Sequence, residues 1–355
     1  METSTVTELV EQARAAARLA EKTDDWDDWN EYRGLLWRAA ADGPGALTLG
    51  QELTGAQDPG ERELGCTLLG YTADRNEEVA PEAAATLVAL AERETDGEVR
   101  RALVRALGRT HEQCAVPVLV TLARHPDADV RSQVAYVFSE VFTGLPDGPD
   151  IRALIGLTRD EDPDVRDRAT HTLGFLSEAD TAEVRSALWE RTDDEYAEAR
   201  KEGIRGLARR HDPRAVPLMA ELLDDPEGVS SLTFRAAGIL GAPELLPYLR
   251  QYNLKDSDVS DAVEACDPEE RARLEAAGWE LLHELDRLRP DLRAGLYRPR
   301  FEEGLSLVVG EGDYDVAALL RRAGGDPARA AGLADADLPV WVPVSDPLAG
   351  AEPVA

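Results

Sequence analysis

The stretch Asp162-Pro-Asp-Val-Arg-Asp-Arg-Ala-Thr-His-Thr-Leu-Gly-Phe-Leu176 is the unit that decides the fold of this chain. Asp162 can cap the first turn of a helix, and Pro163 is tolerated there because its missing N–H would be unpaired in any case. Apolar residues then recur every three or four positions, at Val165, Ala169, Leu173 and Leu176. This spacing predicts one amphipathic helix with a single apolar face. A lone helix cannot bury that face, so we expect further copies.

The pattern does return along the chain. An arginine near the start of each predicted helix is followed eight residues later by a small residue. The arginines are Arg62, Arg100, Arg131, Arg166 and Arg200, spaced by 38, 31, 35 and 34 residues, and the small residues are Gly70, Gly108, Ser139, Gly174 and Ala208. A constant offset within a variable period indicates a fixed helix between connections of different length. A second apolar helix follows each one, most clearly at 212–224 and 113–124.

Over roughly residues 56–252 the chain resembles the HEAT-like repeats, in particular the short type also found in phycobilin lyases. The shared motif is Asp-x-x-Val-Arg-x-x-Ala-x-x-x-Leu-Gly, then Ala-Val-Pro with a Leu close behind. The resemblance implies an all-α, right-handed α-solenoid of helical hairpins whose second helices line the concave side. It is specific for architecture only, because this repeat serves scaffolds, lyases, hydroxylases and DNA glycosylases alike.

The resemblance also implies a structural role for the arginine that follows Val, which packs along a ladder between repeats. Carried over to this chain, the role falls to Arg100, Arg131, Arg166 and Arg200. Asp129 and Asp164 are the nearby acidic partners that the resemblance implies. Two positions depart from the motif, because Arg62 follows Glu61 and Arg200 follows Ala199 where the motif has Val.

Outside the repeats the chain predicts two caps and a tail. Residues 1–55 are expected to form an N-terminal helical cap, and residues 253–290 a pair of C-terminal capping helices, the second at 268–289. We expect residues 291–355 to be an irregular tail, with a short strand near 304–309 and a short helix near 315–323. The apolar segment 338–344 either docks on the last repeats or binds a partner in extended form.

The composition is strongly acidic, with 70 acidic and 39 basic residues and a formal net charge of −31. This balance argues against nucleic acid, whose phosphates need Lys and Arg, and against anionic membrane surfaces. It favours solubility and would speed encounter with a basic partner. Three cysteines, Cys66, Cys114 and Cys266, are far apart and form no CxxC pair, so a reducing cytoplasmic location is expected. Almost all positive charge is Arg, as in GC-rich bacterial genomes.

The sequence contains no recognisable catalytic or metal-binding motif, so no cofactor is expected. His111 and His211 lie at matching positions, each three residues after the small residue of its repeat, and we interpret them as turn residues. Two His-Glu dipeptides, at 111–112 and 283–284, are two fewer than the four that HEAT-repeat hydroxylases use to bind iron. We therefore predict no metal site.

Two sets of residues are candidates for binding a partner. Half of the six Trp side chains are concentrated in one predicted helix, at Trp26, Trp29 and Trp37, where they either close the end of the solenoid or form a contact surface. The other set lies off the apolar stripe of the second helices and would face a partner on the concave side. Its members are Thr121, Arg124, Glu190, Glu221 and Arg250.

The sequence therefore predicts a non-enzymatic scaffold or adaptor that binds a protein partner on the concave face of a solenoid. A first alternative is an immunity or inhibitor protein that neutralises a basic partner with its acidic surface. A second alternative is an enzyme of the chromophore-lyase-like class that uses the groove.

Overall fold

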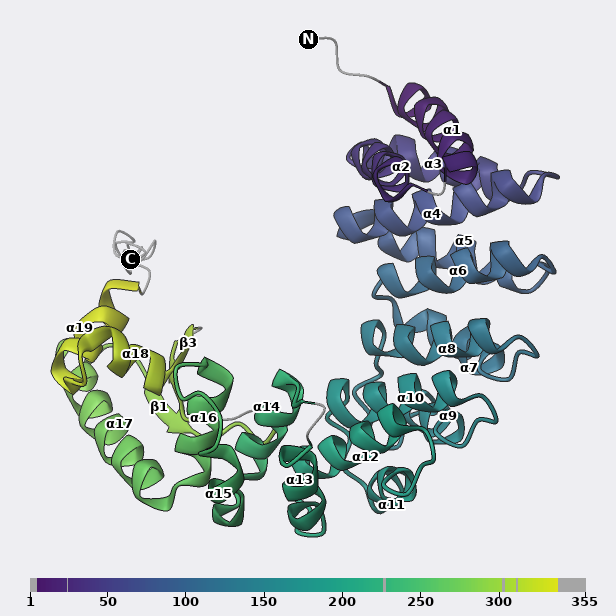
Figure 1. Cartoon of the computed structure of the whole chain (residues 1–355). Helices are drawn as coiled ribbons and strands as arrows, with labels where there is room; N and C mark the ends of the chain where they lie inside the picture. The colour runs from purple at the N-terminus through teal and green to yellow at the C-terminus, as the bar shows by residue number, and fades with distance from the viewer. Residues whose placement is uncertain (1–4, 24, 226–227, 302–303, 311, 338–355) are drawn as a thin grey trace, which may run out of the picture. The chain divides into compact units, whose positions relative to one another are not determined.

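The computed structural model describes residues 5–23, 25–225, 228–301, 304–310 and 312–337 (Figure 1). Contacts along the chain separate it into two compact units, Met1–Leu207 and Ala208–Ala355, with the boundary inside one helix. None of the described helices combines the length and the apolar character that crossing a membrane requires.

The first unit is a stack of helical hairpins. Its helices are α1 (Val6–Thr23), α2 (Trp26–Ala39), α3 (Gly43–Thr54), α4 (Pro59–Arg75), α5 (Ala80–Ala91), α6 (Gly97–Arg109), α7 (Val116–Leu122), α8 (Ala128–Val137), α9 (Pro149–Leu157), α10 (Pro163–His171), α11 (Ala182–Arg191) and α12 (Ala197–Arg209), the last of which crosses the boundary. Short 3-10 turns, η1 (Glu77–Val79), η2 (Gln113–Ala115) and η3 (Phe138–Glu140), adjoin three of them. The predicted all-α solenoid is confirmed here.

Aspartate caps start the repeat helices, as the sequence around Asp162 predicts. The Asp162 carboxylate accepts hydrogen bonds from the backbone N–H groups of Asp164 and Val165 at 3.0 and 3.2 Å. Asp58, Asp96 and Asp127 cap α4, α6 and α8 in the same way. Each carboxylate satisfies N–H groups that have no partner within the helix, which fixes where the helix begins.

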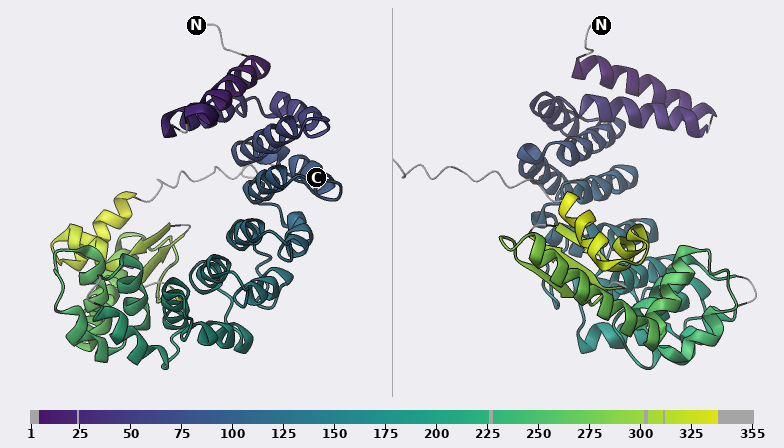
Figure 2. Two further views of the ribbon diagram at one scale, coloured as in Figure 1. Left: turned by 45° about the vertical axis from the view of Figure 1, so that its right-hand side comes forward. Right: turned by 90° about the vertical axis from the view of Figure 1, so that its left-hand side faces the viewer.

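Two parallel rows of helices make up the stack (Figures 1 and 2). Helices α4, α6, α8 and α10 form the inner row, and α5, α7, α9 and α11 form the outer row. Neighbouring helices pack more closely in the inner row than in the outer row, as the concave side of a curved stack requires. The repeat's first helices therefore line the concave side, and the expectation that its second helices do so is wrong.

Small residues allow this close packing. A Cβ on Gly70 would lie 2.9 Å from the Cα of Ala106 in the next inner helix, and a Cβ on Gly206 would lie 2.8 Å from the Cα of Gly174. Larger side chains at these positions would push the helices apart, which explains why a small residue recurs eight positions after each ladder arginine.

The apolar face of the repeat is buried as predicted, except at its last position. Val165, Ala169 and Leu173 are fully buried, whereas Leu176 is 39% exposed. The reason is that residues Thr172–Leu176 form a π-helical turn, η4. A wider turn rotates the following side chains away from the 3.6-residue spacing, so Leu176 leaves the buried face.

The second unit joins two further hairpins to a small mixed module. Its elements are α13 (Ala215–Leu223), α14 (Ser231–Leu240), η5 (Pro243–Leu245), α15 (Leu246–Leu249), α16 (Ser257–Cys266), α17 (Pro268–Leu288), β1 (Ala294–Tyr297), β2 (Ser306–Val309), β3 (Gly312–Asp315), α18 (Val316–Ala323) and α19 (Pro327–Asp337). The strands form an antiparallel sheet in the order β1-β2-β3, with Leu296 opposite Leu307 and Leu307 opposite Tyr314.

The prediction of an irregular tail is wrong for residues 294–337. Alternating residues of β2, Leu307 and Val309, are fully buried against Leu281 and Leu285 of α17, and α18 and α19 complete this core. The predicted closing helix therefore buries one face under the tail. The strand and the helix expected near 304–309 and 315–323 are confirmed as β2 and α18, and the apolar segment 338–344 lies outside the described residues.

Candidate functional site

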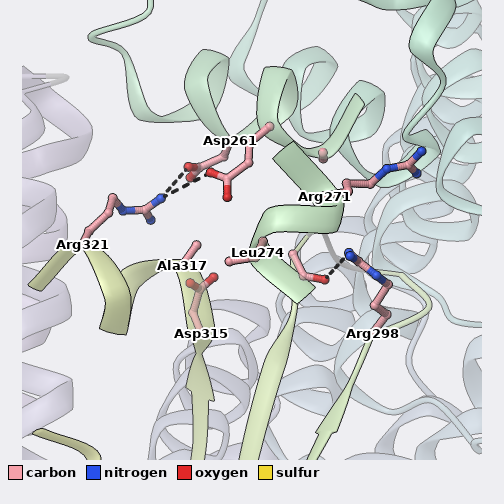
Figure 3. A pocket seen from close by; sticks show the side chains of 10 residues that line it. Asp261, Arg271, Leu274, Arg298, Asp315, Ala317 and Arg321 are labelled. Atoms are coloured by element: carbon pink, nitrogen blue, oxygen red, sulfur yellow. Dashed lines mark hydrogen bonds and ion pairs between the residues drawn. The ribbon is translucent and has the colours of Figure 1, made fainter. Parts of the chain in front are cut away.

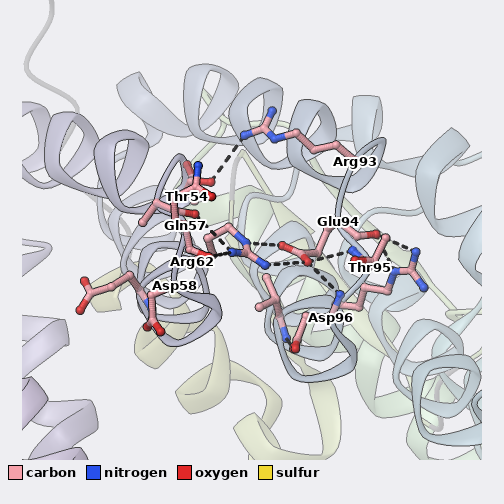
Figure 4. Close-up of polar contacts among 12 residues, drawn as sticks. Thr54, Gln57, Asp58, Arg62, Arg93, Glu94, Thr95 and Asp96 are labelled. Carbon is pink, nitrogen blue, oxygen red and sulfur yellow. Dashed lines mark hydrogen bonds and ion pairs between the residues drawn. The ribbon is translucent and has the colours of Figure 1, made fainter.

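A ladder of ion pairs connects the repeats of the first unit. Arg131 pairs with Asp160 at 2.7 Å, and Arg166 pairs with Asp194 at 2.9 Å. The same guanidinium groups donate back to carbonyls that precede their own helices. Figure 4 shows the third such pair, in which Arg62 points at Glu94 across 2.7 Å although its repeat lacks the motif's Val.

The acidic partner in each pair lies six residues before the next ladder arginine, as Glu94 does before Arg100. The partners implied by the resemblance, Asp129 and Asp164, are therefore wrong. Both residues follow the cap of their own helix, and Asp164 accepts a hydrogen bond from the Tyr196 hydroxyl at 3.1 Å instead of pairing with a ladder arginine.

The ladder arginines Arg100 and Arg200 make the backward contact but have no carboxylate pair among the residues that the structure describes. Arg200 donates to the Asp194 carbonyl at 3.0 Å. Arg100 donates to the Glu94 carbonyl, and its other nitrogen lies 2.8 Å from Nε2 of His125. His125 occupies the place where the other repeats carry the acid.

His125 cannot satisfy both neighbours as an acid does. The backbone N–H of Asp127 points at Nδ1, 3.1 Å away, while Arg100 points at Nε2. A neutral imidazole has one acceptor nitrogen, so only one of these contacts is a hydrogen bond at a time. In contrast, Asp160 accepts from Arg131 and from the N–H of Asp162 together.

We expect His125→Asp to raise the free energy of unfolding by about 1–2 kcal/mol, because a carboxylate there can accept both hydrogen bonds, one of them from a charged donor. Thermal unfolding followed by circular dichroism at pH 7 measures this. His125→Asn is the matched control, since it offers an oxygen without the charge and should gain less. An unchanged or lower melting temperature for His125→Asp would contradict the proposed completion of the ladder.

Glu94 couples the ladder to pH. The hydrogen bonds from Arg62 lower the pKa of Glu94 from 4.5 to about 2, and backbone N–H groups of Asp96 and Thr95 act in the same direction. A lowered folded-state pKa means that the stabilisation is complete above about pH 4.5 and is lost as the pH falls toward 2.

Wild type should therefore be more stable than Glu94→Gln by about 2–3 kcal/mol at pH 7, and the difference should shrink toward zero between pH 4.5 and pH 2. Urea unfolding of both proteins at several pH values tests this. Glu92→Gln, which changes an exposed neighbour, provides the control. A difference between wild type and Glu94→Gln that stays constant down to pH 2 would refute the coupling.

The structure separates the three members of the second candidate set that lie in the first unit from its concave side. Thr121 and Glu190 lie on α7 and α11 of the outer row, and Arg124 follows α7. Glu221 and Arg250 belong to the corresponding second helices of the other unit, on and just after α13 and α15. Three of the five already have protein partners: Thr121 bonds the Pro117 carbonyl, Glu190 pairs with Arg159 at 2.7 Å, and Arg250 pairs with Asp267 at 2.8 Å. Their role in binding remains a prediction.

The three tryptophans do not share one environment. Trp26 is 72% exposed, and Trp29 is partly buried with its ring edge against Tyr32. Trp37 is 40% exposed and makes an edge-to-face contact with Tyr71 of α4, with ring centroids 5.8 Å apart. Trp37 therefore packs against the first repeat helix, α4, whereas Trp26 lies on the cap and is exposed to solvent.

Arginine and aromatic side chains alternate from the cap onto the inner row. The guanidinium of Arg75 lies over Trp37 at 4.6 Å, that of Arg109 lies over Tyr71 at 4.6 Å, and that of Arg168 lies over Tyr136 at 5.7 Å. The ring and its arginine come from two helices that are neighbours in the stack: α2 and α4, α4 and α6, and α8 and α10. With Arg105 on α6, these residues form the arginine–aromatic stripe: Trp37, Tyr71, Arg75, Arg105, Arg109, Tyr136 and Arg168. Sequence periodicity missed the stripe because the residue type changes at its positions: Arg105 and Tyr136, for example, both lie five residues after a ladder arginine.

A cleft of about 340 Å³ opens within this stripe, between α4, α6 and α8. Arg105, Arg109, Gln133 and Tyr136 line it, with His111 at one end, where Asp74 and Glu140 each approach the imidazole at 3.7 Å. His111 has φ +54°, and its counterpart His211 has φ +50°, which confirms both as left-handed turn residues at the ends of their helices.

In the second unit, a much smaller cavity of about 40 Å³ lies beside α16, α17 and α18 (Figure 3). Two of the arginines that line it form ion pairs with other elements: Arg321 of α18 with Asp261 of α16 at 3.1 Å, and Arg298 with Glu275 of α17 at 3.0 Å. Burial raises the pKa of Asp261 while Arg321 opposes that change. The space holds about one water molecule, so these pairs serve to fasten the sheet module.

Among the described residues, no group of three or more His, Cys, Asp or Glu side chains is placed to hold a metal ion. The two His-Glu dipeptides belong to different units, with His111 in the first and His283 on α17 of the second.

Comparisons with known proteins agree with this architecture. The family model for HEAT repeats matches residues 46–139 and 184–267, about half of the chain. No curated protein matches the chain. Among solved structures, YibA of E. coli is 22% identical with a TM-score of 0.54, and the match covers 75% of this chain and 98% of YibA.

Two further solved structures are similar to this chain. Kap95p, in a complex with RanGDP, has a TM-score of 0.55 at 15% identity, covering 81% of this chain and 44% of Kap95p. The CpcE–CpcF phycocyanin lyase of Nostoc has a TM-score of 0.43 at 16% identity, covering 62% of this chain and 93% of that chain. Given the repeat motif, the stacked hairpins and the match to the family model, the chain belongs to the HEAT-repeat proteins.

Proposed function

We propose that this protein is a non-enzymatic interaction scaffold that binds a protein partner on the inner row of its first unit. A stack of hairpins buries one apolar seam and leaves the inner helix faces available along its whole length. Such a surface can contact an extended partner at several repeats at once.

The observation that carries the proposal is the arginine–aromatic stripe. Trp37 and Tyr136 are each 40% exposed, and arginine side chains lie against both rings. Tyr, Trp and Arg are the residues most enriched at binding hot spots, because they combine a large apolar area with directed polar groups. Two exposed rings, one on α2 and one on α8, each with an arginine against it, are not needed for packing within the stack.

The same proposal places the protein in a reducing compartment such as the bacterial cytoplasm. All three cysteines are free, and Cys66 and Cys266 are buried, where burial raises the pKa of the Cys66 thiol to about 12 and keeps it unreactive. The alternatives of an inhibitor of a basic protein and of a lyase-like enzyme have support only from the net charge and from the repeat type, respectively.

Affinity capture from the native host with two bulky variants tests the proposal. Gln133→Trp fills the inner cleft, whereas Thr48→Trp adds the same side chain to an exposed position on α3. We expect a specific protein to be captured by wild type and by Thr48→Trp, and to be lost with Gln133→Trp. Capture that is equal for all three, or absent for all three, would refute binding on the inner row. A captured protein that stays bound at about 1 M salt would also exclude a purely charge-driven inhibitor.

A further inference from the structure

We infer that the cleft between α4, α6 and α8 binds an acidic peptide segment of a protein partner, with a carboxylate on Arg105 and Arg109 and a neighbouring side chain on Tyr136. This inference rests on the proposed scaffold function and adds the chemistry of the segment that is bound. It reverses, at this surface, the expectation of a basic partner that the whole-chain charge suggests.

The first step of the argument is the unpaired charge. Within the part of the chain that the structure describes, no carboxylate oxygen lies within 4.0 Å of the guanidinium nitrogens of Arg105 or Arg109. Arg101, one turn earlier on the same face of α6, pairs with Glu98 and, at 3.1 Å, with Asp127. Other described arginines, such as Arg100 and Arg168, also lack such a partner, but Arg105 and Arg109 lie four residues apart on α6 and line the same cleft.

The second step is desolvation. Burial lowers the pKa of the Arg105 guanidinium, and the charge of Glu63 opposes that change. The Arg105 side chain is exposed, so a carboxylate can reach it, while neighbouring protein atoms displace part of the hydration of its guanidinium. An incoming carboxylate would therefore gain more here than at a fully hydrated arginine, and two neighbouring guanidinium groups can bind it through several hydrogen bonds.

The third step is the shape and lining of the cleft. Its volume of about 340 Å³ accommodates one or two side chains, and Val137, Gly108 and the Tyr136 ring provide an apolar wall next to the arginines. Gln133 adds an amide that can bond a peptide backbone. An acidic residue beside an apolar or aromatic one matches this lining, whereas an isolated anion would leave the wall uncovered.

The fourth step excludes larger anions. Asp74 and Glu140 line the same cleft, on the side of His111. They would repel a doubly charged phosphate more than a single carboxylate, and a net charge of −31 disfavours a polyanion such as nucleic acid. For a short segment, charges beyond about 8 Å are screened at physiological ionic strength, so the nearby arginines decide the interaction.

Fluorescence anisotropy with the full chain tests the inference. The probe is a labelled ten-residue peptide of Gly and Ser with one Glu on each side of a central Trp, and the comparison peptide has Lys in place of each Glu. We expect the acidic peptide to bind and the lysine peptide not to bind. Arg105→Glu with Arg109→Glu should weaken binding at least tenfold, and Tyr136→Ala should weaken it several-fold.

The control is Arg38→Glu with Arg93→Glu, which makes the same charge change at two exposed arginines outside the stripe and should alter binding less than twofold. If charge reversal impairs folding, as judged by circular dichroism, Arg105→Gln with Arg109→Gln replaces it. Equal loss with the control pair, binding of the lysine peptide, or displacement by inorganic phosphate at the peptide's own concentration would overturn the inference. The captured protein distinguishes this inference from the scaffold function. If its capture is lost with Gln133→Trp but is unchanged with the Arg105 and Arg109 variants, binding to the two arginines is wrong and the scaffold function still holds.

Discussion

Asp194→Ala should lower the free energy of unfolding of the first unit by about 3–5 kcal/mol, the cost of leaving a buried charge without its partner. The Asp194 side chain is only 2% exposed, and it accepts from Arg166 at 2.9 and 3.0 Å and from Arg191 at 2.6 Å. Its loss leaves both guanidinium groups unpaired in a poorly hydrated site. The backbone N–H of Tyr196, which bonds the same carboxylate, also loses its acceptor.

Asp193→Ala is the matched control, because the neighbouring residue is exposed and the same atoms are removed. Its effect should stay within about 0.5 kcal/mol. Urea unfolding followed by circular dichroism at pH 7 measures both variants. Equal midpoints for Asp193→Ala and Asp194→Ala would show that the ladder contributes nothing to stability, and its pairs would then be incidental.

The second large effect is expected for Gly206→Ala. A Cβ at this position would lie 2.8 Å from the Cα of Gly174 and 3.0 Å from a methyl group of Leu188. The first of these atoms is backbone, so the two inner helices must separate to admit one carbon. We expect a loss of about 2–3 kcal/mol, typical of an overpacked core.

Gly156→Ala on α9 is the opposite case, because a Cβ there would meet nothing within 4 Å. Ala favours helix by up to about 1 kcal/mol over Gly, so this variant should become slightly more stable. Melting temperatures of the two variants should therefore move in opposite directions from wild type. A shift of the same sign in both would mean that close approach of the inner helices does not decide the role of Gly206.

The sequence predicted the repeat helices well because their signals are local. An aspartate cap, a fixed offset from arginine to a small residue and an apolar stripe all act within about four turns, as at Asp162 and Val165. The tail was harder to predict. Its strands have four residues each, and Leu307 and Val309 become a core only against Leu281 of α17. The sequence between them gives no local sign of that pairing.

In the ladder, too, the sequence predicted one partner of each ion pair and only the tertiary structure showed the other. The sequence identified Arg131 and Arg166 from their place in the motif, but it assigned their acids within the same turn. The actual acids, Asp160 and Asp194, lie 29 and 28 residues further along, where stacking brings the next repeat alongside. The offset between repeats varies, so the separation from each arginine did not indicate its acid; the constant signal is the six-residue spacing between that acid and the next ladder arginine.

The candidate site depended even more on tertiary structure. Arg105, Arg109 and Tyr136 look like ordinary exposed positions of α6 and α8, and only the stacking of α4, α6 and α8 brings them into one cleft. By itself, the sequence determined that the chain is a stack of amphipathic helical hairpins, since hydrophobic periodicity and capping are encoded locally. Tertiary structure alone decided which row of helices is concave and which side chains meet there, because both follow from how closely neighbouring repeats pack.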